Sequence, residues 1–438
     1  MTTTTYNESL AWQARPFEPD HLAQDTSVWQ EAFAWLALLP MLFITVSGAI
    51  QSDNTPIAFR FTAMEEDSLE RRIVRFGCSL LIVCLISSKF RPIWSVCLKS
   101  KILFVLPALA FVSAIWSQNP MHTLVEASSL LLTTLFAIYL YLRYPSDRIV
   151  SFLNFAAFIS LILCLIAVVA FPSIGMDSYQ QDAWRGIFYQ KNTCATTCTL
   201  FLTVGLHTRT RGIVEKLIRF AVISLSILFI IMSASRTGWI VAVLAIILTY
   251  GLRFVICLRS LDRLLFLVLL FVPTLFVGAF IATNFNEILS VLDKDPTMTQ
   301  RTIIWAEVVP SIAKHPIIGY GYSAFWAGLH GESEHTVLVT RWMEGQAQEG
   351  YLDIMLQLGL AGLIPLLAII VRAFGQAIKT IENRKLDVSV LLAITLLPLV
   401  LVENIGETLF LLPLSIPWFY TLIALFTLSM RSQRTEDI

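Results

Sequence analysis

A series of long apolar runs is the feature that most constrains the fold of this 438-residue chain. A helix needs about 20 apolar residues to cross a bilayer, within a range of roughly 17–25. Twelve runs approach that length, near residues 32–50, 73–88, 102–116, 123–142, 149–171, 193–207, 217–233, 238–254, 264–282, 351–371, 388–402 and 411–430. They lack the alternation of a membrane barrel, so helices are the fitting structure. We therefore expect an all-α polytopic membrane protein of twelve transmembrane helices.

The composition supports the bilayer as the solvent of this chain. Hydrophobic residues make up 56% and charged residues only 14%, whereas soluble domains carry roughly 25% charge. The 31 basic and 31 acidic residues balance, so no basic excess predicts a nucleic-acid partner. The seven cysteines show no metal-binding spacing and are expected to pack as small apolar side chains.

The distribution of Lys and Arg predicts the orientation. Basic residues gather in alternate connections, within 89–101, 143–148, 209–219, 253–263 and 372–385, and again at 431–434. Such connections face the cytoplasm in membrane proteins. We therefore expect a single membrane domain, 1–438, with cytoplasmic tails at 1–31 and 431–438. The polar segment 283–350 becomes a long periplasmic loop containing short amphipathic helices.

Three cations lie in connections predicted to face outward, where the preference of Lys and Arg for the cytoplasmic side makes positive charge unusual. Arg236 lies between two apolar runs with almost no loop, and an arginine at mid-bilayer costs about 2.5–3.5 kcal/mol. It is either an interfacial anchor beside Trp239 or part of an anion site. Arg185 and Lys191 precede the next outward span beside aromatic residues, which suit headgroup depth.

The long loop has its own pattern. Residues 302–313 predict an amphipathic helix, with Ile304, Val308 and Ile312 on one face and Pro310 expected to kink or shorten it. Arg301 at the helix start opposes the helix dipole, which favours a ligand-binding role over a capping role. His315 follows the helix and has an ordinary role available as a C-terminal charge or a turn residue.

Several short motifs occur in a shared order around this loop. They are Trp116-Ser117-Gln118-Asn119-Pro120, the Gly-x-x-x-x-Lys-Asn stretch from Gly186 to Asn192, Ser235-Arg236, Arg301 with Trp305, His315-Pro316-Ile317-Ile318-Gly319-Tyr320-Gly321, and Tyr351 to Gly362. Together they resemble the O-antigen ligase and Wzy-type polysaccharide polymerase superfamily, close to its exopolysaccharide-polymerase branch.

The resemblance implies polymerisation of undecaprenyl-pyrophosphate-linked repeat units into exopolysaccharide at the periplasmic face of the bacterial inner membrane. It implies a membrane-lipid environment, a chain-length regulator protein as partner, and neither cofactor nor metal. Arginine suits a pyrophosphate leaving group because it binds phosphate bidentately and stays charged. The expected pyrophosphate-binding residues are Arg236, Arg301, Arg185 and Lys191, with His315, Tyr320, Asn404 and Glu407 in support.

The sequence departs from the ligases at the general base. Where those relatives carry a His-Asn pair, this chain has Gln348 and Glu349, and glutamine cannot accept the proton. Glu349 is the candidate base, because a carboxylate can serve when its pKa is raised; Glu344 and His335 lie in the same loop. Alternatively, the reaction needs no dedicated base, or this chain is a weakly active or partner-binding relative.

Other functions stay open at this level. Transfer of glycan to a lipid or protein acceptor is one alternative to polymerisation. A metal-dependent lipid-sugar glycosyltransferase would use acidic residues in the first outward loop, where Glu65, Glu66 and Asp67 lie. A polysaccharide flippase or other transporter would carry ionisable residues at mid-span, whereas Asp353, Glu403 and Glu407 lie near predicted outer ends.

Overall fold

The computed structural model describes residues 69–177, 183–188, 190–257, 301–327, 331–340, 345–383 and 386–436. Within these ranges every regular element is a helix, and the only isolated β-bridge joins Met176 to Trp184. The predicted spans near 32–50 and 264–282 lie outside the described residues, as do the tail 1–31, the loop residues 283–300, the acidic group 65–67 and position 344. The all-α prediction is confirmed for the described part.

The ten other predicted apolar segments are helical. The elements are α3 (Leu69–Ser87), α4 (Phe90–Lys99), η1 (Lys101–Phe104), α5 (Val105–Val112), η2 (Ser113–Ile115), α6 (Pro120–Arg143), α7 (Ser146–Ala170), α8 (Pro172–Gly175), α9 (Lys191–His207), α10 (Ile213–Met232), α11 (Arg236–Cys257), α14 (Arg301–Lys314), α15 (Ser333–Thr340), α16 (Gly350–Glu382), α17 (Val388–Glu403) and α18 (Ile416–Glu436).

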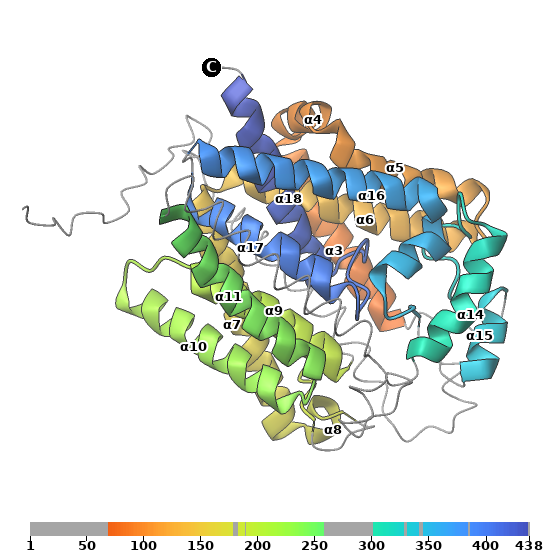
Figure 1. Ribbon diagram of the computed structural model, residues 1–438, viewed down its shortest axis with the longest axis horizontal. Helices are drawn as coiled ribbons and strands as arrows, with labels where there is room; N and C mark the ends of the chain where they lie inside the picture. Colours follow the sequence, from red (N-terminus) through yellow and green to blue (C-terminus); the bar gives the residue numbers. More distant parts are fainter. Residues whose placement is uncertain are drawn as a thin grey trace, which may run out of the picture.

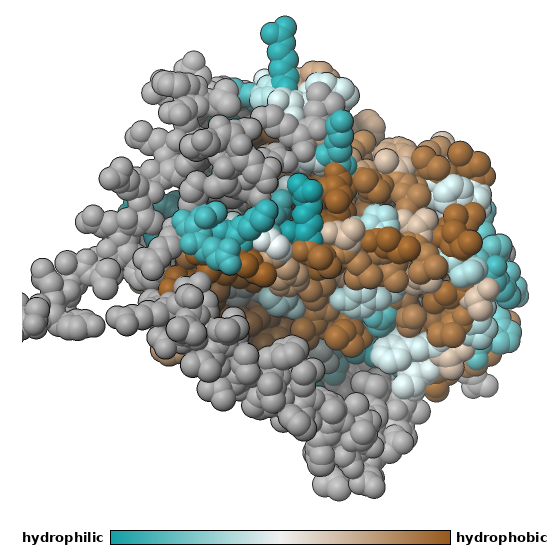
Figure 2. Space-filling model, turned by 45° about the horizontal axis from the view of Figure 1, so that its top comes forward, coloured by the Kyte–Doolittle hydropathy of each residue, from teal (hydrophilic) through white to brown (hydrophobic). Residues whose placement is uncertain are grey.

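Four of these helices are long and apolar enough to cross a membrane: Pro120–Arg143, Asp147–Ala170, Arg236–Ile256 and Gly350–Glu382. The bent pair α3 and α4, which meet at 93°, makes a fifth candidate if it forms one span. Large apolar side chains are exposed along these helices, and Figure 2 shows an apolar face over much of the described surface. A multi-pass membrane protein is therefore supported, while the full count of twelve stays a prediction.

The long helices lie side by side, and α18 is at the centre of the bundle (Figure 1). Residues of α18 are almost entirely buried from Ile416 to Ser429, and it contacts α6, α16 and α17. Capping residues fix the helix starts. Asn119 accepts the His122 N–H at 3.2 Å ahead of Pro120, and Asp387 accepts the Val390 N–H at 2.9 Å.

The connections predicted to face outward gather at one end of the bundle. The indole of Trp116, before α6, donates to the carbonyl of Ile318 at 3.1 Å. The Gly350 N–H, at the start of α16, donates to the carbonyl of Asn404 after α17 at 2.8 Å. Helices α14 and α15 cover the same end (Figure 1). Polar residues far apart in sequence are therefore brought together there.

The segment 404–415 is a loop that descends into the bundle, so the last predicted span begins at Ile416 and not at residue 411. Its Leu414 N–H donates to the Thr133 hydroxyl at 3.0 Å, about 20 Å along α6 from the start of that helix. Asn404 supports the loop, because its Oδ1 accepts the N–H groups of Leu409 and Phe410. Side-chain oxygens thus accept hydrogen bonds from backbone N–H groups that have no partner within a helix.

Helix α16 is interrupted at Gly359, whose φ of 59° and ψ of −156° are non-helical. The motif from His315 to Gly321 fills the break. Leu360 N–H donates to the carbonyl of Pro316 at 2.9 Å, and Tyr320 N–H donates to the carbonyl of Leu356 at 2.8 Å. A side chain at Gly359 would lie 2.4 Å from the backbone of Ile317, so glycine is required by both conformation and space.

Helix α14 confirms the amphipathic helix predicted for 302–313. Ile304 and Val308 are buried and pack with Tyr320, Phe325 and Leu356 in a small core of their own. The helix continues through Pro310 to Lys314, so the expected shortening is wrong. Pro310 is exposed, which lets the carbonyl that loses its partner face away from the packed side.

Candidate functional site

Arg301 and Glu407 form a buried ion pair where the connections converge. Arg301 is the first residue of α14, and its Nη2 donates to the Glu407 Oε1 at 2.6 Å. Its Nε donates to the Gln348 Oε1 at 2.9 Å. Arg301 is 9% exposed and Glu407 is 4% exposed. Because guanidinium has five N–H donors, these two bonds leave donor capacity for a ligand.

The spacing of Arg301 and Trp305 has a geometric explanation. Residues four apart lie on one face of a helix. The Trp305 indole donates to the carbonyl of Ala347 at 3.1 Å, beside the bond from Arg301 to Gln348. Both side chains therefore hold the segment before α16, in which Gln348 has a left-handed φ of 52°.

Two predicted cations, Lys191 and Arg236, lie close to this pair. Arg301 Nη1 and the Thr237 methyl group would be 3.2 and 3.6 Å from a side-chain carbon at Gly406. The absence of a side chain there lets α11 and α14 approach each other. The Lys191 ammonium, at the start of α9, interacts electrostatically with Arg236 and with Asp177.

Close packing of α9 against α11 brings these starts together. A side chain at Gly238 would lie 2.5 Å from the Ala195 Cβ, so only glycine allows the two helices this approach. Asn192, next to Lys191, hydrogen-bonds to Glu407. The Gly-x-x-x-x-Lys-Asn and Ser-Arg motifs therefore meet the Arg301–Glu407 pair in one place.

The electrostatics of the pair depend on Glu407. Burial raises the pKa of Glu407 to about 7, against the lowering effects of the Arg301 charge and the Asn192 hydrogen bond. The carboxyl group is therefore partly protonated near neutral pH. In that neutral form it does not compensate the Arg301 charge, which is then available to an anion.

Arg185 has a different environment from the other predicted cations. It is buried, and its Nε donates to the carbonyl of Ile174 at 2.9 Å in the short helix α8. Its Nη2 donates to the carbonyl of Ser173 at 3.4 Å. Two of its N–H groups thus stabilise the turn before α9, which positions Lys191.

His315 and Tyr320 contact each other in the turn after α14. Their rings meet edge to face with centroids 4.7 Å apart, and the Tyr320 hydroxyl donates to the carbonyl of Ser311 at 2.8 Å. Burial raises the pKa of Tyr320 to about 12. These contacts fix the turn that fills the break in α16, so both residues support the wall of the site.

Glu349 is the N-cap residue of α16. Its Oε2 accepts the Leu352 N–H at 2.5 Å. Burial raises the pKa of Glu349, while hydrogen bonds from the Leu352 and Tyr351 backbone lower it. A half-buried carboxyl group with a raised pKa satisfies one requirement of a general base, although its capping bond occupies one oxygen.

A polar cavity of about 220 Å³ adjoins the ion pair and was not predicted from the sequence. Its lining includes His122, Ser323, Trp326, Asp353, Gln357 and Thr408. Thr408 follows Glu407 in the chain, and Asp353 accepts the Ala347 N–H next to Gln348 at 2.9 Å. The cavity and the ion pair therefore share two backbone segments. The one sequence feature that could have indicated the cavity is the position of His122, two residues after the Asn-Pro turn.

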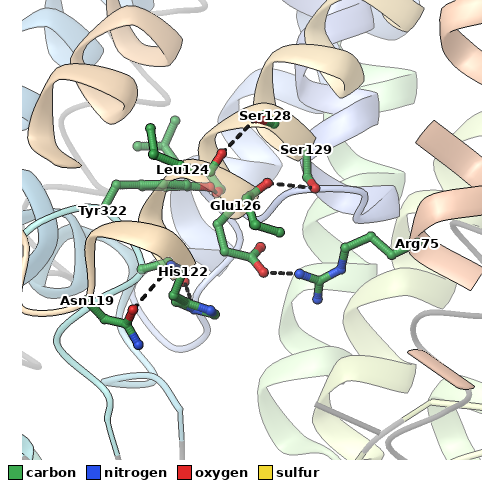
Figure 3. Close-up of polar contacts among 11 residues, drawn as sticks. Arg75, Asn119, His122, Leu124, Glu126, Ser128, Ser129 and Tyr322 are labelled. Atoms are coloured by element: carbon green, nitrogen blue, oxygen red, sulfur yellow. Dashed lines mark hydrogen bonds and ion pairs between the residues drawn. The ribbon is translucent and has the colours of Figure 1, made fainter. Parts of the chain in front are cut away.

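The side of the cavity formed by α6 carries charged neighbours. Figure 3 shows His122 and Glu126 on successive turns of α6, with the Glu126 carboxylate meeting Arg75 of α3. The Thr123 hydroxyl donates to the carbonyl of Tyr322 at 2.8 Å, which joins α6 to the turn after α14. The pairing of Glu126 with Arg75 stabilises the contact between α3 and α6.

Residues 221–367 match the O-antigen ligase family model. The chain is also similar to the exopolysaccharide production protein ExoQ of Rhizobium meliloti (strain 1021), with 29% identity over 162 residues. That match covers 35% of this chain and 37% of the relative, so it spans little more than a third of either protein. Both matches are similarities over part of the chain, and they support the predicted resemblance to the O-antigen ligase and ExoQ-like family.

Proposed function

We propose that this protein polymerises lipid-pyrophosphate-linked oligosaccharide repeat units into exopolysaccharide at the outer face of a bacterial inner membrane. The observation that carries the proposal is the meeting of the segments that bear Arg301, Arg236 and Lys191: Arg301 contacts Glu407, Thr237 lies near Gly406, and Asn192 bonds to Glu407. Clustered cations suit a pyrophosphate anion, and residues 221–367, which include Arg236 and Arg301, match the O-antigen ligase family model.

The chemistry is a glycosyl transfer. The bond between the anomeric carbon and the pyrophosphate oxygen breaks, and its electron pair leaves with the lipid pyrophosphate. An acceptor hydroxyl forms the new glycosidic bond and loses its proton. Preorganised cations that face the charge developing on the leaving group are usually the largest contribution to such catalysis. Arg301 and Arg236 have this role, Lys191 supports it, and Arg185 positions the start of α9.

A chain-length regulator partner, cytoplasmic termini and the periplasmic position of 283–350 belong to the same proposal, and Glu349 is the candidate for the base that the sequence indicates. Transfer to a lipid or protein acceptor is the second candidate function, because the matching family model describes an O-antigen ligase. The product decides between them: a polymer ladder indicates polymerisation, and a single modified acceptor indicates ligation.

The test is complementation of a deletion strain by Arg301→Ala and Arg236→Ala at matched protein level. Arg236 is exposed, so its loss should leave the fold intact. Both variants should shorten the polymer and accumulate lipid-linked repeats at the outer face. Arg211→Ala is the matched control, because Arg211 is exposed and lies near Asp147 at the opposite end. Normal polymer length in either site variant would disprove the site assignment, whereas repeats trapped inside would indicate a flippase.

A further inference from the structure

The cavity beside the ion pair is built from five separate segments. The start of α6 supplies His122, the turn after α14 supplies Ser323 and Trp326, and the first turns of α16 supply Asp353 and Gln357. Residues 345–346 and 408–413 complete the walls. Non-helical backbone this far inside a membrane bundle is tolerated where it is buried in protein or lines a water-filled cavity. The descent of 404–415 therefore indicates a cavity that the fold maintains.

Backbone strain is concentrated around the same space. Five non-glycine residues among those described have a left-handed φ. Ser323 and Leu411 line the cavity, Leu414 lies in the same loop, and Gln348 bonds Arg301. Such conformations cost on the order of 1–3 kcal/mol each and persist only where the surrounding structure holds them. Four of the five thus belong to the cavity or to its neighbouring ion pair.

The lining chemistry differs from that of the ion pair. None of the described residues that line the cavity is a Lys or Arg, so this part of its wall is poorly suited to pyrophosphate. Its lining combines aromatic rings, Trp326 and Tyr322, with the neutral polar groups of Gln346 and Gln357. Apolar ring faces and neutral hydrogen-bonding groups are what a sugar residue requires, because its hydroxyls need polar partners and its C–H faces need apolar ones.

His122 is the lining residue best placed to exchange a proton. The other titratable groups of the lining are engaged. Asp353 accepts from Trp326 Nε1 at 2.9 Å, from Ala347 N and from Thr408 Oγ1, and the Tyr322 hydroxyl donates to the carbonyl of Leu411 at 2.5 Å. The His122 imidazole is exposed at the mouth, with its Nε2 3.3 Å from the Ser323 hydroxyl.

We propose that this cavity holds the acceptor sugar and that His122, rather than Glu349, accepts the proton of the attacking hydroxyl. The inference rests on the proposed function. The acceptor oxygen bonds to the anomeric carbon, the bond from that carbon to the pyrophosphate oxygen breaks, and the electron pair leaves with the lipid pyrophosphate. The hydroxyl proton moves to His122 Nε2. Arg301 and the cavity then hold the two reactants in adjacent positions along the shared segments 347–348 and 407–408.

The test uses the full chain in lipid nanodiscs. The donor is the lipid-linked oligosaccharide extracted from the deletion strain, and the acceptor is a labelled oligosaccharide from partial hydrolysis of the wild-type strain's surface polysaccharide. His122→Gln should lower kcat by about 100-fold or more, while the donor Kd stays within about twofold of wild type. Ser128→Ala, on an exposed position of the same helix, is the control and should leave both values unchanged.

Two readouts separate proton transfer from a structural role. Imidazole in solution should restore part of the rate of His122→Gly, because the mouth of the cavity is open to small molecules. The acid limb of the wild-type pH–rate profile should disappear in His122→Gln. The charged or titratable groups around His122 are the Arg75–Glu126 ion pair of α3 and α6 and the lining residues Tyr322 and Asp353. The profile is therefore also measured in an Arg75→Lys background, which keeps the charges of the Arg75–Glu126 pair. A kcat within about threefold of wild type, or a rate without rescue, would overturn the role of His122.

Binding of the free labelled oligosaccharide tests the cavity independently of catalysis. Wild type should bind it, Gln346→Ala should weaken binding at least about tenfold, and the control Ser128→Ala should leave it unchanged. Failure of wild type to bind overturns the cavity assignment, even where Arg301-dependent donor binding persists and supports the proposed function. Oligosaccharide binding without transfer from any lipid-pyrophosphate donor would instead disprove the proposed function and retain a sugar-binding cavity.

Discussion

Replacement of Arg301 separates the structural from the catalytic contribution of the buried pair. Arg301→Ala removes the bonds to Glu407 and Gln348 at 2.6 and 2.9 Å and leaves a carboxyl group in a site that is almost closed to water. We therefore expect two effects from one substitution: loss of stability through the stranded Glu407, and loss of donor binding through the missing cation.

The expected magnitude follows from the geometry. Two unit charges about 4 Å apart at an effective dielectric constant of about 20 attract by about 4 kcal/mol. Removing one member of a buried pair typically costs about 3–5 kcal/mol, in agreement with that estimate. Burial raises the pKa of Glu407 to about 7 against the lowering effect of Arg301, so without Arg301 that pKa should rise further, and proton uptake should relieve part of the cost at pH 7 and below. At pH 6 we expect a loss near about 3 kcal/mol.

A double-mutant cycle with Glu407→Gln provides the assay. The free energy of unfolding of Arg301→Ala/Glu407→Gln should exceed that of Arg301→Ala, since each single variant leaves one buried charge unpaired and the double variant leaves none. Donor binding should stay weakened by about 10-fold to 150-fold, the value of a charge-assisted hydrogen bond of about 1.5–3 kcal/mol. A double variant with restored stability and wild-type donor affinity would refute the assignment of Arg301 to the pyrophosphate.

Three further predictions use other parts of the site. Donor affinity should weaken as pH rises through about 7, because deprotonated Glu407 then neutralises the cation beside it, and Glu407→Gln should remove this dependence in binding titrations. Gly359→Ala should prevent stable folding, whereas Gly375→Ala in the same helix, which has open space, should cost nothing; thermal unfolding compares them. Glu349→Ala should destabilise the protein by about 1 kcal/mol, whereas Glu349→Ser should retain the helix cap, so the free energy of unfolding tests the capping role. Full activity of Glu349→Gln would exclude the Glu349 carboxylate as the base.

Periodicity and apolar length were sufficient to predict most of the elements. The helix over 302–313 was predicted from Ile304, Val308 and Ile312, and its buried side follows that stripe. Its continuation past Pro310 was not predicted, because the cost of a proline depends on whether the freed carbonyl is exposed. The loop 404–415 was also misjudged at its end, since Leu411, Leu412 and Leu414 are as apolar as a span, whereas Pro413 and tertiary hydrogen bonds keep this stretch out of a helix.

The sequence predicted those site residues whose positive charge departs from the usual scarcity of Lys and Arg in outward connections or at helix starts. Arg236 and Lys191 were selected because cations are unusual in outward connections, and Arg301 because it opposes the helix dipole. The structure pairs Arg301 with Glu407 and relates Lys191 electrostatically to Arg236, while their role as a pyrophosphate site stays a prediction. Arg185 was selected for the same reason, yet its N–H groups serve the backbone of α8. An unusual charge therefore indicates a task without distinguishing ligand binding from support of the chain. The position of His122 in the sequence is not unusual, and only the folded structure shows that it lines a cavity formed by five segments.

If the chain transfers glycans as proposed, a site divided into a donor compartment and an acceptor compartment explains why the missing ligase histidine need not abolish transfer. The cations that face the leaving group are fixed by α9, α11 and α14, whereas the proton acceptor must follow the hydroxyl of the acceptor sugar. A base on the segment 348–349 would lie between the compartments, and a base at position 122 would approach the hydroxyl from α6. Since the leaving group needs the same cations in either case, the base can change position while Arg301 cannot. Comparison of His122→Gln with Glu349→Gln in the same nanodisc assay tests this separation directly, because only the variant of the true base should lose turnover while donor affinity is retained.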